Sequence, residues 1–216
     1  SGSAPCGRYP LPMHAPPQAI DLLLTNAGEV ATPIGRQARA GADLGRIDRI
    51  PGGAVAIDQE RIVDVGPAAA LAERYRPRQR FDCQGGLLLP GLIDAHTHAV
   101  FAGSREREFE LRNQGASYAE IARSGGGILA TVQRVRAASE EELTGGLLQR
   151  LDRFLEHGTT TIECKSGYGL SREGELKCLR AMAGAARQHP VELVPTFLGA
   201  HAYPPEFAGN RPAYVD

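Results

Sequence analysis

Two histidines separated by one residue, His96 and His98, stand at the end of an apolar segment that begins at Leu87. Side chains alternate along a β-strand, so both imidazoles are expected to project from one side, with Asp94 sharing that side one step deeper. Two imidazoles at the carboxyl end of a buried strand can bind one divalent metal ion. The alternative is a pair of polar strand-end residues without a metal, and the apolar run LLLPGLID before the pair favours the metal site.

Other side chains that could bind a substrate follow the expected strands. Arg105 lies in the loop after the two histidines, and its guanidinium fork suits a carboxylate, although a solvated surface arginine is the alternative. Tyr168 stands between glycines, which let a loop approach a ligand closely. His201 is expected to end a later strand and to face the same end of the sheet, although a satisfied core histidine is the alternative. For Lys165 the sequence leaves two alternatives: a structural lysine at a strand end, or a residue that lies near the site.

The elements that position these residues alternate between strand and helix from residue 87 onward. The segment 87–99 is almost continuously apolar, as a strand buried on both faces requires. Capping boxes at Ser117 and Ser139 each open a helix. The remaining signals predict a helix over 128–137, strands over 159–164 and 191–198, and helices that end near Gly158 and begin at Ser171.

This order predicts parallel β/α units and an α/β fold. A complete eight-unit barrel takes about 250 residues, so residues 87–216 are expected to hold the first three strands of a partial, truncated (β/α)8 barrel. An open parallel sheet is the alternative, but no glycine-rich phosphate loop follows the first strand.

The sequence before residue 87 differs in composition and in the elements it predicts. Residues 1–18 are rich in proline and predict a disordered leader, native or added. Residues 19–86 predict a small β subdomain. Its expected elements are a strand over 19–24, a hairpin of 54–57 with 61–65, a helix over 68–75 and a strand over 81–83. The polar stretch 25–53 carries no clear element.

Composition excludes several classes of protein. Hydrophobic residues make up 42% and the formal net charge is -1, which is typical of a globular chain and not of a nucleic-acid-binding one. No apolar run is long enough to cross a membrane. The four cysteines match no C-x-x-C pattern and no secretory signal is seen, so we expect reduced thiols and a cytoplasmic location.

Three separated motifs resemble the imidazolonepropionase family of the amidohydrolase superfamily. They are LLLPGLIDAHTHAVFAGSRE, KSGYGL and PTFLGAHAYPPEF, and they agree with the family in order and spacing. The resemblance implies a (β/α)8 barrel with a small β-sandwich. It also implies hydrolysis of the cyclic amide 4-imidazolone-5-propanoate to N-formimidoyl-L-glutamate, with one divalent metal ion, zinc or iron.

The resemblance also implies roles for individual residues. His96 and His98 are metal ligands in this interpretation. The substrate would be bound by Arg105, Tyr168, His201 and Tyr118, the last of which also opens a helix. A third histidine, an aspartate ligand and a general acid/base glutamate are expected after Asp216, so no catalytic residue is assigned within the chain. The full-length protein is expected to be a homodimer, and the chain alone to be inactive.

Two other hypotheses remain open at this point. One is a different metal-dependent amidohydrolase, either a deaminase or another cyclic-amide hydrolase. The other is a non-catalytic scaffold that keeps the fold.

Overall fold

The computed structural model describes residues 16–35 and 37–215, so nearly all of the leader expected over residues 1–18 lies outside the described residues. The chain divides into two compact units, Ser1–Pro90 and Gly91–Asp216. Within the described residues, no helix has the length and apolarity needed to cross a bilayer.

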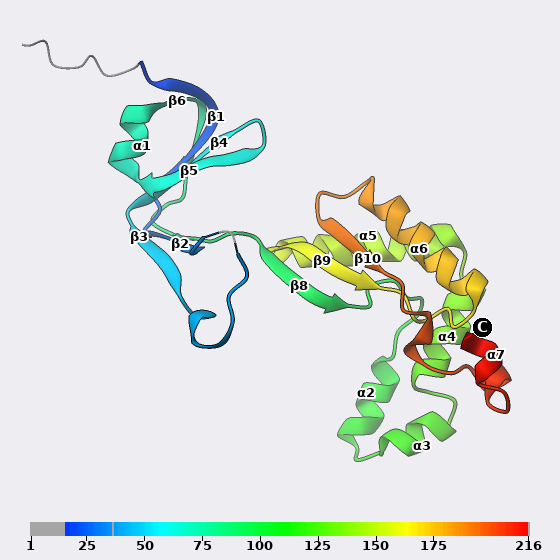
Figure 1. Cartoon of the computed structure of the whole chain (residues 1–216). Helices are drawn as coiled ribbons and strands as arrows, with labels where there is room; N and C mark the ends of the chain where they lie inside the picture. The colour runs from blue at the N-terminus through cyan, green and yellow to red at the C-terminus, as the bar shows by residue number, and fades with distance from the viewer. Residues whose placement is uncertain (1–15, 36, 216) are drawn as a thin grey trace, which may run out of the picture. The chain divides into compact units, whose positions relative to one another are not determined.

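The first unit contains a four-stranded sheet in the order β5-β4-β1-β6 (Figure 1). Its strands are β1 (Gln18–Thr25), β4 (Gly53–Asp58), β5 (Arg61–Pro67) and β6 (Tyr75–Asp82). The hairpin predicted from the sequence is confirmed, because β4 and β5 pair antiparallel. Helix α1 (Ala68–Arg74) buries Leu71 against Ile20 and Leu23 of β1, which forms a small apolar core.

Two of the three strands of a second sheet in this unit lie in the stretch 25–53, for which the sequence predicts no element. Its order is β3-β2-β7, with β2 (Glu29–Pro33), β3 (Ile47–Pro51) and β7 (Leu87–Leu88), and a short 3-10 turn η1 spans Gly41–Asp43. Strand β2 pairs antiparallel with β3 and parallel with β7. These pairings are distant in sequence. Strand β3 is mostly exposed, and β2 buries only Val30 and Ala31, which is too short an apolar run to predict a strand.

The second unit is built on a parallel three-stranded sheet in the order β10-β9-β8. Its strands are β8 (Leu92–Thr97), β9 (Thr159–Lys165) and β10 (Glu192–Thr196). Helices α5 (Glu140–Glu156) and α6 (Arg172–Ala186) run beside this sheet and share its core, which includes Ile162 and Cys164 of β9 (Figure 1). The alternation of strand and helix therefore produces parallel β/α units, as the sequence predicts.

Helix α5 shows why local patterns succeed here. Ser139 accepts a hydrogen bond from the backbone amide of Glu142, whose side chain accepts from the amide of Ser139, so the predicted capping box is confirmed. Leu143, Leu147 and Leu151 recur at helical spacing and are fully buried.

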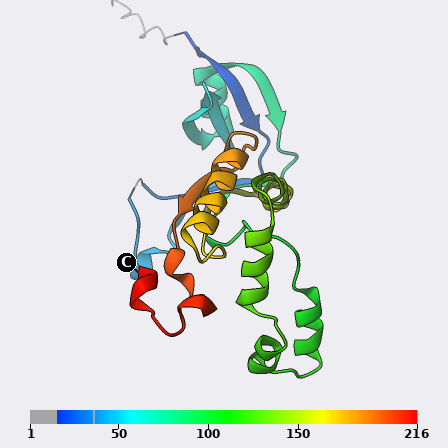
Figure 2. The same cartoon turned by 90° about the vertical axis from the view of Figure 1, so that its right-hand side faces the viewer.

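The other helices form a separate group. Helix α4 (Ile128–Ala137) has the predicted bounds, and α3 (Tyr118–Arg123) follows the predicted capping box at Ser117. Helix α2 (Glu106–Asn113) has no buried residue and no apolar stripe, so the sequence does not predict it. Figures 1 and 2 both show α2 and α3 lying away from the sheet. The chain continues after β10 through 3-10 turns η2 (Gly199–His201) and η3 (Pro205–Phe207) to the short helix α7 (Pro212–Val215).

The prediction of one continuous buried strand from Leu87 is wrong. The segment forms two strands, β7 and β8, which belong to different sheets and different units. Pro90 separates them because a proline has no amide hydrogen to donate to a sheet. Leu92 is 52% exposed and Ile93 72% exposed, so β8 is not buried on both faces among the described residues.

Candidate active site

Four aromatic rings gather where the carboxyl ends of β8, β9 and β10 meet. The rings of His96 and His98 are 5.7 Å apart between centroids. His98 stacks on His201 at 4.6 Å with an interplanar angle of 14°. Tyr168 lies 5.1 Å from His98 and 5.6 Å from His201. The structure therefore brings together residues separated by about half the chain, at the edge where parallel α/β sheets carry their sites.

Strand β8 reaches this arrangement with an irregular step. Asp94 pairs with Ile162 and Thr97 pairs with Cys164, so three residues of β8 span two of β9. The regular alternation that predicts Asp94 on the face of both histidines is broken at this step. Instead, the carboxylate of Asp94 accepts a hydrogen bond of 3.1 Å from the backbone amide of His96.

The environment of His98 fixes which ring nitrogen is free. Its Nδ1 lies 2.9 Å from the carbonyl oxygen of Ser166. A carbonyl oxygen only accepts hydrogen bonds, so Nδ1 carries the hydrogen and Nε2 keeps its lone pair. Burial, followed by the nearby His201, lowers the pKa of His98 below its usual value. Both effects favour the neutral imidazole, which is the form that binds metals.

His201 is held in the same way, although it does not end a strand as the sequence predicts. Strand β10 ends at Thr196, and His201 lies in η2. Its Nδ1 is 3.0 Å from the carbonyl oxygen of Gly167 and therefore donates to it. Tyr168 follows directly and is half-buried, and burial raises the pKa of its phenol.

Arg105 lies beside this cluster at the N-terminus of α2. Its Nε donates to Oε2 of Glu108 at 2.8 Å, and this contact is the main reason why the pKa of Arg105 is raised. The phenols of Tyr168 and Tyr118 lie close enough to contribute in the same direction. Tyr118 opens α3 and is 65% exposed.

A cavity of about 560 Å³ adjoins Arg105 between α2, α3 and α4. Its lining includes Arg105, Glu108 and the glycines Gly125 and Gly126. A guanidinium that borders such a cavity can present its remaining N–H groups to a small anion.

Lys165 and Glu163 form an ion pair next to the histidines. Glu163 also accepts a hydrogen bond of 2.6 Å from the hydroxyl of Thr196. Lys165 is one of the charges that lower the pKa of His98, so it lies near the site. The sequence leaves two alternatives for Lys165, and the structure combines them: the residue lies near the site and forms a structural ion pair with Glu163.

The donor set for a metal ion is incomplete within the described residues. No group of three His, Cys, Asp or Glu side chains in residues 16–35 and 37–215 is arranged to hold a metal. The two imidazoles of His96 and His98 still fit such an ion, because they are adjacent and Nε2 of His98 has its lone pair available.

Four residues that support the site are not predicted from the sequence: Ser166 and Glu108, described above, and Arg136 and Glu175, which bind the backbone of the loop that carries Tyr168. Ser166 acts through its backbone carbonyl, and the type of a residue does not predict which partner its carbonyl binds. Glu175 stands in the first turn of α6, where an acidic residue ordinarily complements the helix dipole at the surface. Its burial has no signal in the sequence.

Comparison with known proteins gives consistent matches. Residues 53–76 match a family described as "Imidazolonepropionase-like composite domain, bacteria". The chain is 50% identical over 200 residues to an imidazolonepropionase of Symbiobacterium thermophilum, which covers 91% of the chain and 47% of that protein. It is 50% identical over 198 residues to an imidazolonepropionase of Myxococcus xanthus, with 91% and 47% covered. The chain thus spans about half the length of the curated relatives it matches.

Solved structures show likeness of fold alone. The chain matches an Escherichia coli guanine deaminase with a TM-score of 0.55 and 16% identity, over 80% of the chain and 35% of that protein. It matches an adenosine deaminase of Xanthomonas campestris, solved with bound zinc, with a TM-score of 0.52 and 20% identity, over 84% and 43%.

Proposed function

We propose, from its homology with imidazolonepropionases over about nine tenths of its length, that the chain is the N-terminal part of such an enzyme. The reaction is the hydrolysis of 4-imidazolone-5-propanoate to N-formimidoyl-L-glutamate. The observation that carries the proposal is the juxtaposition of His98, Tyr168 and His201, with Arg105 beside them, in a chain half identical to enzymes of that name.

His96 and His98 would hold one divalent metal ion, zinc or iron. When bound, such an ion lowers the pKa of a coordinated water toward ~7 and so makes hydroxide available near neutral pH. The other ligands and the general acid/base glutamate belong to the complete enzyme in this proposal, after Asp216. Within the chain, the hydrogen bond from Nδ1 of His98 to the carbonyl of Ser166 would leave Nε2 as the nitrogen that binds the ion.

The substrate carries a carboxylate at one end and a cyclic amide at the other. Arg105 would bind the carboxylate through the N–H groups that Glu108 does not occupy. Tyr168 and His201 would contact the ring next to the metal, and Tyr118 would close the opposite side of Arg105. In this proposal the cyclic amide would lie near the residues that hold the metal ion, and the carboxylate would lie at Arg105.

The architecture of the complete enzyme follows from the same proposal. The sheet β10-β9-β8 represents the first three strands of a (β/α)8 barrel, and the first unit represents part of a small β-sandwich. The complete enzyme is cytoplasmic and a homodimer in this interpretation, with a small molecule as its substrate and neither nucleic acid nor membrane as a partner.

The test uses the gene product that contains this chain, purified and supplied with zinc or iron. Incubation with 4-imidazolone-5-propanoate is followed by mass spectrometry of N-formimidoyl-L-glutamate, with adenosine and guanine as competing substrates. We expect turnover of the imidazolone alone, and its loss after treatment with a chelator. Deamination of either purine without hydrolysis of the imidazolone would refute the proposal, and so would activity that survives substitution of both His96 and His98 by alanine.

A further inference from the structure

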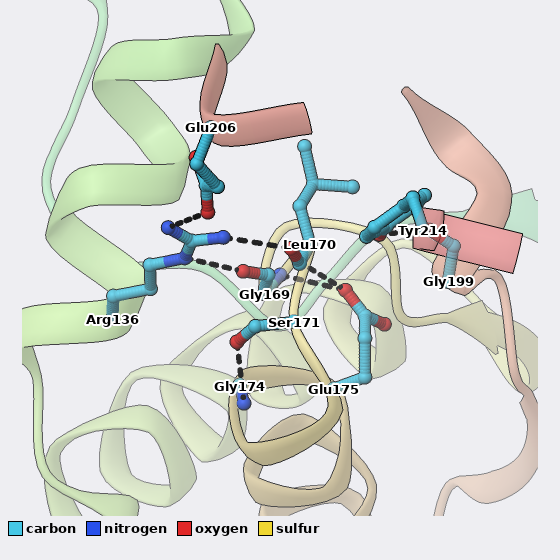
Figure 3. A network of polar contacts seen from close by, with 9 residues as sticks. All are labelled: Arg136, Gly169, Leu170, Ser171, Gly174, Glu175, Gly199, Glu206 and Tyr214. Atoms are coloured by element: carbon cyan, nitrogen blue, oxygen red, sulfur yellow. Dashed lines mark hydrogen bonds and ion pairs between the residues drawn. The ribbon is translucent and has the colours of Figure 1, made fainter. Parts of the chain in front are cut away.

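Glu175 is a buried acidic residue to which the reaction assigns no role. It lies in the first turn of α6 and is only 1% exposed. Its Oε2 accepts a hydrogen bond of 2.8 Å from the amide of Gly167, and its Oε1 accepts from the amides of Gly169 at 2.8 Å and Leu170 at 2.7 Å. Figure 3 shows this carboxylate beneath the loop that links β9 to α6.

All three donors to Glu175 are backbone amides of one loop. A buried carboxylate costs free energy unless hydrogen bonds replace its water, and a glutamate at a helix start could face solvent without that cost. Burial at this position therefore requires the loop to fold around the carboxylate. The loop of residues 166–170, which carries Tyr168, therefore folds around the carboxylate of Glu175.

The peptide group between Ser166 and Gly167 connects Glu175 to the metal-binding histidine. Its N–H donates to Glu175 and its C=O accepts from Nδ1 of His98. Hydrogen bonds to the two ends of one peptide polarise it in the same direction, so the carboxylate strengthens the carbonyl as an acceptor. This arrangement transmits the effect of an outer carboxylate to a ligand histidine through the backbone.

Gly167 itself connects Glu175 to the imidazole of His201, because its amide donates to Glu175 while its carbonyl faces that ring. The carbonyl of Gly167 accepts from Nδ1 of His201. Gly167 has a φ of +109°, and a Cβ built on it would come 2.8 Å from that same Nδ1. The loop and His201 are thus in close contact, and a shift of Gly167 moves His201 with it.

Arg136 of α4 holds the same loop from its other side. Its Nε donates to the carbonyl of Gly169 and its Nη2 to that of Leu170, both at 2.7 Å, and its Nη1 pairs with Glu206 at 2.8 Å (Figure 3). Gly169 and Leu170 are therefore bound through their amides by an anion and through their carbonyls by a cation. Such a loop has little freedom to place Tyr168 anywhere else.

We propose that Glu175 is a positioning residue that, through the backbone of residues 166–170, fixes the Nδ1–H tautomers of His98 and His201 and the place of the Tyr168 phenol. The effect of Glu175 on catalysis rests on the proposed function. The effect of Glu175 on the two imidazoles rests on the hydrogen bonds described above and is tested separately.

The variant Glu175→Gln preserves size and removes one acceptor. Its amide oxygen can still accept from Gly169 and Leu170, but its NH2 group then meets the N–H of Gly167, donor against donor. The expected damage is therefore confined to the peptide that holds His98 and the residue that holds His201. Glu173→Gln is the matched control, because Glu173 lies on the same turn with a side chain that is 85% exposed.

Both variants are made in the gene product that contains the chain. We expect Glu175→Gln to lower kcat/KM for 4-imidazolone-5-propanoate about 10- to 100-fold, mostly in kcat, as loss of an outer-sphere partner does. Glu173→Gln should leave both constants unchanged. The second readout is long-range 15N–1H NMR of 15N-histidine in chelator-treated protein. It should show His98 and His201 as Nδ1–H tautomers in the wild type, and a changed His98 signal in Glu175→Gln alone.

The two readouts separate the possible failures. Altered histidine signals in Glu175→Gln without imidazolone turnover by the wild type would sustain the positioning role and reject the proposed function. Unchanged histidine signals and unchanged kcat/KM in a folded Glu175→Gln protein would overturn the inference. If that variant does not fold, hydrogen exchange in the wild type decides. Slow exchange of the Gly167 amide together with Nδ1–H on His98 supports the inference, whereas fast exchange or Nε2–H on His98 overturns it.

Discussion

Arg105 and Glu108 form an ion pair in which one carboxylate oxygen serves the guanidinium and the other serves the backbone. Oε2 of Glu108 accepts from Nε of Arg105 at 2.8 Å, and Oε1 accepts from the amide of Gly127 at 3.0 Å. Glu108 thus ties the start of α2 to the glycine run before α4. Its side chain is 15% exposed and that of Arg105 is 41% exposed, so the guanidinium is oriented from the protein side and open on the other.

Substitution of Arg105 by lysine should raise the KM for 4-imidazolone-5-propanoate about 10- to 100-fold, with a smaller change in kcat. A lysine keeps the charge but loses the fork that binds a carboxylate with two N–H groups, and a charge-assisted hydrogen bond contributes about 1.5–3 kcal/mol. Steady-state kinetics on the gene product measures the changes in KM and kcat separately. Arg112→Lys, at an exposed residue of the same helix outside the cavity lining, is the control, and an equal effect of both variants would speak against the role of Arg105.

Substitution of Glu108 by glutamine should destabilise the fold at neutral pH, and the difference from the wild type should shrink in acid. Arg105 lowers the pKa of Glu108 from its ordinary value of 4.5. A lowered folded-state pKa gives stability that is present above the unfolded value and lost as the pH falls through the folded value. Urea unfolding at pH 6 and at steps below pH 4.5 measures this. A difference that is independent of pH would contradict it.

The elements that the sequence predicts best are those whose signals are local. The helix over 128–137 has its predicted bounds, and the capping box at Ser139 forms as expected. A cap and an apolar stripe lie within one or two helical turns, so neighbours in sequence decide them. Strands β2 and β3 are not predicted from the sequence, because their partners lie far along the chain. Strand β3 is also mostly exposed, and β2 buries only two residues, Val30 and Ala31.

The same contrast holds at the site. Residues with a distinctive side chain, such as His98 and Tyr168, can be selected from the sequence because their chemistry is carried by the side chain itself. The groups that orient the imidazoles of His98 and His201 cannot be selected in this way, because they are backbone carbonyls of Ser166 and Gly167. Glu175 belongs with these, since burial rather than residue type gives it its contacts.

Truncation of Leu147 to alanine should lower the free energy of unfolding by about 2–5 kcal/mol, as removal of a fully buried leucine does. Leu147 lies in the middle of the α5 stripe, in the core shared with β9 and α6. Leu155→Ala, on the same helix but 41% exposed, should cost less than about 1 kcal/mol. Urea denaturation of both variants compares them, and equal losses would show that the stripe is not the buried face.

The described cysteines should differ sharply in reactivity. Burial raises the pKa of Cys178 to about 12 and also raises that of Cys164, and both are fully buried. Cys83 is half-buried and free. Iodoacetamide reacts with thiolates that it can reach, so at pH 8 the folded chain should be labelled at Cys83 well before Cys164 and Cys178. Peptide mass spectrometry follows each site, with urea-unfolded chain as the control in which all three react. Fast labelling of Cys178 in the folded chain would contradict its burial.

The 216-residue chain by itself should bind zinc weakly and show no turnover of 4-imidazolone-5-propanoate. Catalytic zinc sites use three protein ligands, whereas no three His, Cys, Asp or Glu side chains among the described residues are arranged to hold a metal ion. Competition with a chromogenic chelator measures the affinity. His98→Ala should abolish the weak binding that remains, because it removes the imidazole that Ser166 holds in the metal-binding tautomer. His157→Ala, at the exposed residue that caps the C-terminus of α5, should not change it. Tight binding that survives His98→Ala would place the metal elsewhere, and turnover by the isolated chain would show that the remaining ligands already lie within it.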